Sequence, residues 1–221
     1  MTRGSVAFAD LAVKDLFPTP IWTLDVRPDV MQEMNPRLLD AILALMTPRP
    51  ALPPGANWQT DPILHRHPAF ADFVKMVEQA GRSAAKFLRL KDTDLFVTGC
   101  WGNVNPPGGR NSPHTHPNNF LSGVYHVSLP GAASSLVLHD PRPQAFVMMP
   151  PVAEFSPHNG NTSTLEVKEG RMVLFPGWLT HSVPVNSTDQ DRVSIAFNLM
   201  FRNYVENASP ALWKGTVRVG R

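Results

Sequence analysis

Histidines recur in the 221-residue sequence at a spacing that suits metal binding. Two pairs have the form His-x-His, and residues i and i+2 of an extended strand point to the same side, so both rings can reach one ion. His114 and His116 lie between Pro113 and Pro117, at the mouth of a predicted strand. A third ring, His181, begins a later predicted strand. Because neutral imidazole is a common metal ligand, these three histidines predict a metal site.

Four other histidines have no such third partner or no partner at all by spacing. His65 and His67 form the second pair, but they lie in a predicted loop directly before Pro68 and have no third partner. We interpret this segment as a surface or helix-capping one. His139 and His158 have no partner by spacing and are predicted to be surface or turn residues.

An arginine follows the third histidine. Arg192 lies eleven residues after His181 and begins a predicted strand on which Ser194 points to the same side. A buried guanidinium needs an anion, because an unpaired buried charge is costly, and its fork suits a carboxylate, with Ser194 as a second donor. The alternative is an ordinary salt bridge between Arg192 and Asp189 or Asp191.

The elements that must position these residues begin with a partly helical N-terminal region. A strand is predicted over 20–26, where a sheet edge would tolerate its proline. One helix is predicted to begin with Asn35 as its cap and Pro36 in its first turn. A second helix is predicted over about 68–90, because its apolar residues recur at helical spacing. The proline-rich segment 47–57 between them predicts a loop.

The rest of the chain is predicted to be strands. From Leu95 onward, alternation with period two and β-forming residues predict short strands separated by turns. These strands fall near 95–105, 120–128, 134–139, 144–149, 163–167, 171–175, 180–185 and 191–201. Short strands without helices between them predict an antiparallel barrel or jelly roll. We expect a mainly β fold in one structural domain, with 1–92 packing on a core of 93–203 and 204–221 as a tail.

Composition sets limits on the location and partners of the chain. The net charge of +2 gives no reason to expect a nucleic-acid partner. No apolar stretch approaches the roughly 20 residues that span a bilayer, and we find no secretory signal before Asp10. Cys100 is the single cysteine, which excludes an intrachain disulfide and fits the reducing cytoplasm. We therefore predict a cytoplasmic protein without membrane contact.

An ordered set of short segments extends over most of the chain. They are 16–22, 58–60, 114–117 (His-Thr-His-Pro), 121–125 (Leu-Ser-Gly-Val-Tyr), 140–142, 174–176, 181–184 and 192–198. The set resembles the 2-oxoglutarate- and Fe(II)-dependent oxygenase superfamily, and within it a group of small bacterial and phage oxygenases with a His-x-His-Pro…Ser-Gly-Val-Tyr pattern.

The resemblance implies a double-stranded β-helix that binds Fe(II), 2-oxoglutarate and O2 in one open end. By position it implies that His114 and His181 are metal ligands and that Arg192 binds the far carboxylate of 2-oxoglutarate. The implied activity is that of a dioxygenase that hydroxylates an unidentified small-molecule or peptide substrate and releases succinate and CO2.

The residue at position 116 departs from the superfamily, which usually has Asp or Glu two residues after its first histidine. With His116 the metal would have a three-histidine face, which carries one negative charge less and should bind Fe(II) more weakly. The alternative is a carboxylate from elsewhere, for which Asp140 is the candidate. Asp140 also suits a turn, because Pro141 follows it.

Further residues are predicted near the cosubstrate. Asn103 and Asn105 alternate on one strand and either bind cosubstrate or substrate or form a polar strand edge. Of the adjacent Tyr125 and His126 only one can face the cavity, and the superfamily's use of a tyrosine near this position favours Tyr125.

Substrate-pocket candidates are Asn105, Asn198 and Trp178, the last of which also suits simple packing. The substrate itself is not readable from the sequence. Leu212 and Trp213 in the tail could pack on a partner subunit, which makes a homodimer one expectation.

Three rival interpretations remain open. A cupin-type dioxygenase or isomerase would use the same barrel and metal without 2-oxoglutarate; Gly108 has the cupin spacing to His114, but Leu121 occupies the region where the cupin motif has glutamate. A zinc hydrolase with a dinuclear site would have an aspartate shortly after His116, where Asn118 follows. A non-enzymatic barrel would bind its ligand without metal.

Overall fold

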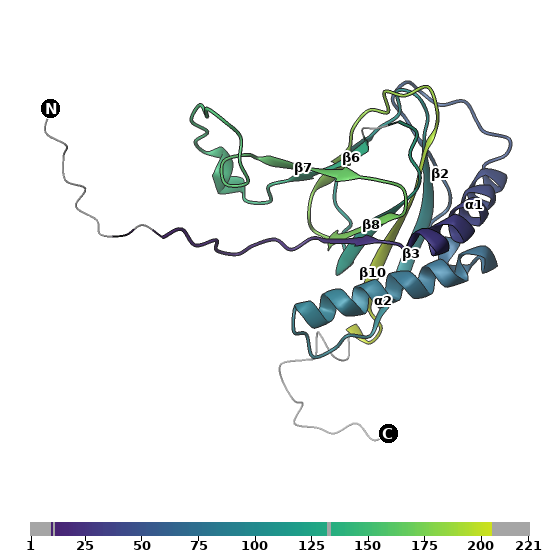
Figure 1. Ribbon diagram of the computed structural model, residues 1–221, viewed down its shortest axis with the longest axis horizontal. Helices are drawn as coiled ribbons and strands as arrows, with labels where there is room; N and C mark the ends of the chain where they lie inside the picture. Colours follow the sequence, from purple (N-terminus) through teal and green to yellow (C-terminus); the bar gives the residue numbers. More distant parts are fainter. Residues whose placement is uncertain (1–9, 11, 132–133, 205–221) are drawn as a thin grey trace, which may run out of the picture.

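The computed structural model describes residues 10, 12–131 and 134–204. Within them, two antiparallel sheets face each other and two helices cover the outer face of the larger sheet (Figure 1). The helices are α1 (Pro28–Leu45) and α2 (Ala71–Phe87), joined by a segment with the short 3-10 helices η1 (Leu64–Arg66) and η2 (Pro68–Phe70).

The larger sheet has six strands in the order β1-β8-β5-β10-β3-β2. Their bounds are β1 Trp22–Asp25, β8 Arg171–Pro176, β5 Leu121–Ser128, β10 Arg192–Phe201, β3 Leu95–Asn105 and β2 Trp58–Gln59. The smaller sheet has the order β4-β9-β6-β7. Its strands are β4 Asn111–His114, β9 His181–Val183, β6 Ser134–His139 and β7 Thr162–Val167. The predicted mainly β, jelly-roll architecture is confirmed.

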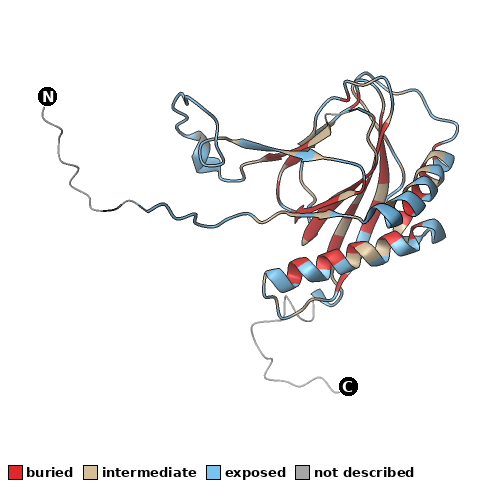
Figure 2. Ribbon diagram, viewed as in Figure 1, coloured by how far each residue is buried: buried red, intermediate tan, exposed pale blue. Residues whose placement is uncertain are grey.

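The main apolar core lies between the helices and the outer face of the larger sheet (Figure 2). α2 presents Phe73, Val77 and Ala84 to this core, and each is at most 1% exposed. Gly81 allows the close approach of α2, because a Cβ at that position would lie 2.8 Å from Leu199 Cδ1. A smaller core around Leu136 fills the space on the other side of the larger sheet.

The first helix differs from its prediction. α1 begins at Pro28, whose fixed φ suits a first turn, and runs through Pro36 instead of starting there. Asn35 is therefore not a cap: its Nδ2 donates to the Val127 carbonyl at 2.8 Å, and its Oδ1 accepts from the Tyr125 hydroxyl at 2.7 Å. Burial of Leu38 and the rest of the apolar stripe holds the helix together across the interior proline.

One strand prediction was wrong, and β4 was not predicted. The segment predicted as a strand over 144–149 contains a 3-10 helix, η3 (Pro143–Phe146), and Met148 after it is exposed and belongs to neither sheet. β4 was missed because Pro113 within it masks the alternation. The interpretation of the segment with His65 and His67 as a surface or helix-capping one is confirmed, since His67 Nδ1 accepts from the Ala69 amide at the start of η2.

Within the described ranges, neither helix is long and apolar enough to cross a membrane. Most of the predicted tail, including Leu212 and Trp213, lies outside the described residues, so its role in a homodimer stays a prediction.

Candidate metal centre and its pocket

The smaller sheet brings two of the predicted histidines directly opposite each other. His114 ends β4, His181 begins β9, and the two are Cα partners in the antiparallel pair, with ring centroids 4.3 Å apart. His116 follows two residues after β4, and its amide donates to the Gly177 carbonyl at 2.8 Å. Gly177 has no room for a Cβ, which would overlap the Asn119 carbonyl oxygen. The turn before β9 therefore packs on the loop after β4, and this contact sets the third ring beside the other two.

The three rings converge closely enough to share one ion. One potential ligand atom from each of His114, His116 and His181 lies within 4.8 Å of the others, and the Nε2 atoms of His116 and His181 are 3.3 Å apart. Two nitrogens bound at right angles to one ion, with bonds of about 2.1 Å, lie about 3 Å apart. The observed spacing thus fits a metal site.

Backbone carbonyls fix the tautomers of two of these rings. His114 Nδ1 lies 2.7 Å from the Ser112 carbonyl oxygen and His181 Nδ1 lies 2.9 Å from that of Leu179. A carbonyl oxygen only accepts, so each Nδ1 carries the proton and each Nε2 offers a lone pair. This is the tautomer that a metal ligand needs.

Burial keeps two of the rings, those of His116 and His181, neutral. It lowers the pKa of His116 and that of His181 to about 4, with a smaller contribution from the neighbouring His114 in each case. Phe175 packs on His181 with ring centroids 4.5 Å apart, and Trp101 packs on His116 at 5.5 Å. Clustered imidazoles suit a divalent transition metal, and iron is among those that imidazole binds.

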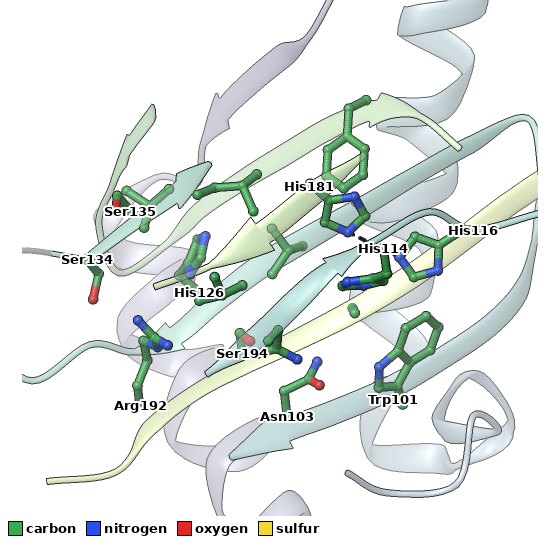
Figure 3. A pocket seen from close by; sticks show the side chains of 18 of the residues that line it. Trp101, Asn103, His114, His116, His126, Ser134, Ser135, His181, Arg192 and Ser194 are labelled. Carbon is green, nitrogen blue, oxygen red and sulfur yellow. Dashed lines mark hydrogen bonds between the residues drawn. The ribbon is translucent and has the colours of Figure 1, made fainter. Parts of the chain in front are cut away.

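A pocket extends from these rings between the two sheets (Figure 3). The three histidines lie at one end, Arg192 and His126 lie at the other, and Ser194 and Asn103 lie between them. The remaining lining residues are Gln59, Trp101, Asn111, Gly123, Val124, Ser134, Ser135, Leu136, Val167, Phe175, Val183 and Ala196. None of these described lining residues is acidic, so the pocket is suited to an anion.

Arg192 supplies the positive charge of the pocket. It is 5% exposed, and its Nη2 donates to the Pro184 carbonyl at 2.9 Å. Burial lowers its pKa. Asp191, which the sequence offered as a salt-bridge partner, pairs with Arg49 instead. No carboxylate among the described residues pairs with Arg192, so this buried guanidinium is available to a ligand anion.

Asn103 presents its amide group to the pocket in a fixed orientation. Its Oδ1 accepts from Gln59 Nε2 at 2.7 Å and from Asn57 Nδ2 at 3.4 Å. Because both neighbours are donors, the Nδ2 of Asn103 is left as a donor toward the pocket. Asn103 is also the Cα partner of Ser194 on β10, which places two donors side by side.

Tyr125 does not face the cavity, and this prediction was wrong. Tyr125 belongs to the main core under the helices, whereas the adjacent His126 lines the pocket. Because side chains alternate along β5, the two residues point to opposite faces of the sheet. α1 and α2 pack on the outer face, so Tyr125 lies beneath them and His126 points to the pocket.

The other candidates also lie elsewhere. Asn105 donates to Asn111 and Asn198 accepts from Ser122, and neither Asn105 nor Asn198 lines the pocket. Trp178 is 53% exposed in the turn after β8 and does not line the pocket. Both carboxylate oxygens of Asp140 accept from Arg142, and Asp140 is not part of the histidine cluster.

Sequence reasoning missed Trp101 and His126 as pocket residues. Trp101 could have been found, because it alternates with Asn103 on the predicted strand and so shares its face. His126 could have been found only by knowing which face of β5 the helices cover.

Comparison with known proteins agrees with this architecture. Residues 99–198 match the family model described as "Putative 2OG-Fe(II) oxygenase". No curated protein matches the sequence.

Three solved structures show the likeness of the fold. The prolyl-4-hydroxylase of Pseudomonas putida is 16% identical, with a TM-score of 0.55 over 84% of this chain and 94% of that chain. HygX from Streptomyces hygroscopicus, solved with nickel and 2-oxoglutarate bound, is 12% identical, with a TM-score of 0.54 over 84% of each chain. The epimerase SnoN from nogalamycin biosynthesis is 12% identical, with a TM-score of 0.60 over 83% of this chain and 79% of that chain. At these identities the likeness shows the fold alone.

A double-stranded β-helix with clustered imidazoles inside one end defines a class of metal-dependent barrel enzymes. The family match is more specific: residues 99–198, which include the three clustered histidines and Arg192, match a family of 2OG-Fe(II) oxygenases, and this match indicates Fe(II) as cofactor and 2-oxoglutarate as cosubstrate. The cupin-type alternative without 2-oxoglutarate is therefore set aside.

Proposed function

We propose that this enzyme is a hydroxylase in which His114, His116 and His181 hold Fe(II) and Arg192 holds the far carboxylate of 2-oxoglutarate. One observation carries the proposal: three clustered imidazoles and a buried guanidinium that no carboxylate of the described residues pairs with line the same pocket. When bound, iron with 2-oxoglutarate and O2 supplies an oxidant for an unactivated C–H bond, and succinate and CO2 are released.

The residues of the chain bind and orient in this scheme, and no protein side chain has to act as a general base. The Nε2 lone pairs of His114 and His181 are directed by the backbone carbonyls that fix their Nδ1 protons. Arg192 gives one end of the pocket its charge, and Ser194 and Asn103 add donors between the two ends.

Apolar side chains restrict water around the site. Phe175, Leu136 and Val183 line the pocket beside the polar residues. Exclusion of water strengthens the electrostatic interaction between Arg192 and a bound carboxylate. For the substrate, the superfamily implies a small molecule or a peptide.

Succinate release tests the proposal. Wild type and the variants His181→Ala and Arg192→Ala would be reconstituted anaerobically with Fe(II), and succinate would be measured after addition of 2-oxoglutarate and O2. We expect Fe(II) content and turnover to be lost in His181→Ala, and turnover to be lost with Fe(II) retained in Arg192→Ala. His158→Ala, an exposed histidine variant, is the matched control and should behave as wild type. Equal succinate release from all four proteins would refute the residue assignments.

A further inference from the structure

His126 is buried without any hydrogen-bond partner. It is 5% exposed, and both of its ring nitrogens lack a partner among the described residues. Buried polar groups in proteins are almost always paired, and an unpaired one destabilises the fold. A side chain in this state requires a partner that the described residues do not provide.

The position of His126 indicates where that partner binds. His126 lies on β5 and is the Cα partner of Ser194 on β10. It lines the pocket at the end where Arg192 lies, away from the three clustered histidines (Figure 3). Both Arg192 and His126 are thus close to whatever occupies this end.

The ring of His126 is neutral in the free protein. Burial lowers its pKa to about 3, with smaller contributions from the charges of Arg192 and Arg171. A neutral imidazole carries one N–H donor. It therefore brings a hydrogen bond to an anion without adding a second charge beside Arg192.

Packing alone does not account for an imidazole at this position. Val124, two residues earlier on the same face of β5, also lines the pocket and is apolar. An apolar residue at position 126 would continue that face and leave no nitrogen unpaired. A ligand with acceptor oxygens beside Arg192 accounts for the histidine.

We propose that His126 is a cosubstrate-binding residue that donates a ring N–H to the carboxylate held by Arg192, the far carboxylate of 2-oxoglutarate. This inference rests on the proposed function. Arg192 and His126 approach the carboxylate from neighbouring strands, so its two oxygens are shared between a charged and a neutral donor.

The test compares two ligands in two variants. Binding of 2-oxoglutarate and of pyruvate to anaerobic, Fe(II)-loaded protein would be measured by calorimetry in wild type, His126→Leu and His126→Gln. Pyruvate is the matched ligand, because it has the same keto-acid end and lacks the far carboxylate. The thermal stability of each metal-free protein would be measured alongside.

We expect His126→Leu to bind 2-oxoglutarate about tenfold to a hundredfold more weakly, as for the loss of a hydrogen bond to a charged group. Pyruvate and Fe(II) binding should be unchanged. His126→Gln keeps a side-chain N–H donor, so its affinity for 2-oxoglutarate should fall less than that of His126→Leu. The metal-free His126→Leu protein should be at least as stable as wild type, because no buried nitrogen is left unpaired; a purely structural role would instead make it less stable.

Two results would overturn the inference while leaving the proposed function standing. In the first, His126→Leu binds 2-oxoglutarate as tightly as wild type does. In the second, the affinity of His126→Leu for pyruvate falls as much as its affinity for 2-oxoglutarate. Wild type that fails to bind 2-oxoglutarate with Fe(II) present would overturn both proposals. If His126→Leu does not fold, the imidazole ¹⁵N resonances of Zn(II)-loaded wild type are measured instead, and the signal that is absent from His126→Gln is assigned to His126. The inference predicts that 2-oxoglutarate shifts this signal. An unshifted signal counts against the inference.

Discussion

Tyr125 and His126 are neighbours on β5 and both are almost completely buried, yet their polar atoms differ in one respect. The Tyr125 hydroxyl donates to Asn35 at 2.7 Å, and its ring packs on Phe73 at 5.5 Å. The nitrogens of His126 have no partner in the described chain. At this point of β5 the chain therefore satisfies the polar group that faces the helices, whereas the described residues leave the one that faces the pocket unpaired.

The same division runs along β10. Val193, Ile195 and Phe197 belong to the main core, and the alternating residues Arg192 and Ser194 line the pocket. One face of this sheet thus packs in the core and the other lines the pocket. Substitutions on the outer face should change the free energy of unfolding, and those on the inner face should change ligand affinity.

The largest effect is expected on the outer face. Phe73→Ala should lower the free energy of unfolding by about 3–5 kcal/mol, because the residue is 1% exposed and packs on both Tyr125 and Phe197. Urea unfolding measures the change. Affinity of the folded protein for 2-oxoglutarate should stay the same. A destabilisation below about 1 kcal/mol would show that the outer face is not where stability resides.

The corresponding variant of the inner face is Arg192→Met. Loss of one partner of a buried charge pair costs about 2–5 kcal/mol of binding, so 2-oxoglutarate should bind about thirtyfold more weakly or worse. The free energy of unfolding should not fall, because a buried charge without a protein carboxylate has been removed. Calorimetry with Fe(II)-loaded protein measures the affinity. The matched control is Arg142→Met, whose guanidinium is paired with Asp140 outside the pocket; equal losses in both variants would contradict the division.

Tyr125→Phe sharpens the comparison between the two neighbours. Removal of the hydroxyl leaves Asn35 Oδ1 without its donor, so stability should fall by about 1–3 kcal/mol. Binding of 2-oxoglutarate should be unaffected. The opposite pattern, weaker binding with stability unchanged, would place Tyr125 in the pocket.

The smallest effect is expected at the sheet edge. Hydrogen bonds from Arg171, and then from Lys168, hold the pKa of Asp25 well below its usual range. Asp25 is 44% exposed, so solvent screens the pair and Asp25→Asn should cost less than about 1 kcal/mol. Because the folded-state pKa is depressed, this stabilisation is complete above the unfolded value of about 4 and disappears as the pH falls toward the folded one. A difference between wild type and variant that persists in strong acid would contradict this assignment.

Sequence reasoning found the metal site better than it found the pocket walls. The His-x-His spacing and the later His181 predict a cluster without detailed knowledge of the barrel. The three histidines lie at or just beyond ends of strands, and strand ends meet at the open end of a jelly-roll barrel. Closeness in sequence to His181 did not predict the position of Trp178, which is exposed to solvent and not in the pocket. The choice between Tyr125 and His126 was not accessible either: period two sets them on opposite faces, and only the position of the helices says which face is inside. The start of the first helix was also predicted wrongly at Pro36, because burial of α1 outweighs the local penalty of an interior proline.

Anomalous diffraction at the iron edge tests the central claim most directly. Crystals grown anaerobically with Fe(II) and 2-oxoglutarate should show one iron bound by nitrogens of His114, His116 and His181, with the far carboxylate of 2-oxoglutarate at Arg192. Iron bound at another place, or iron held by a protein carboxylate such as Asp140, would contradict the account.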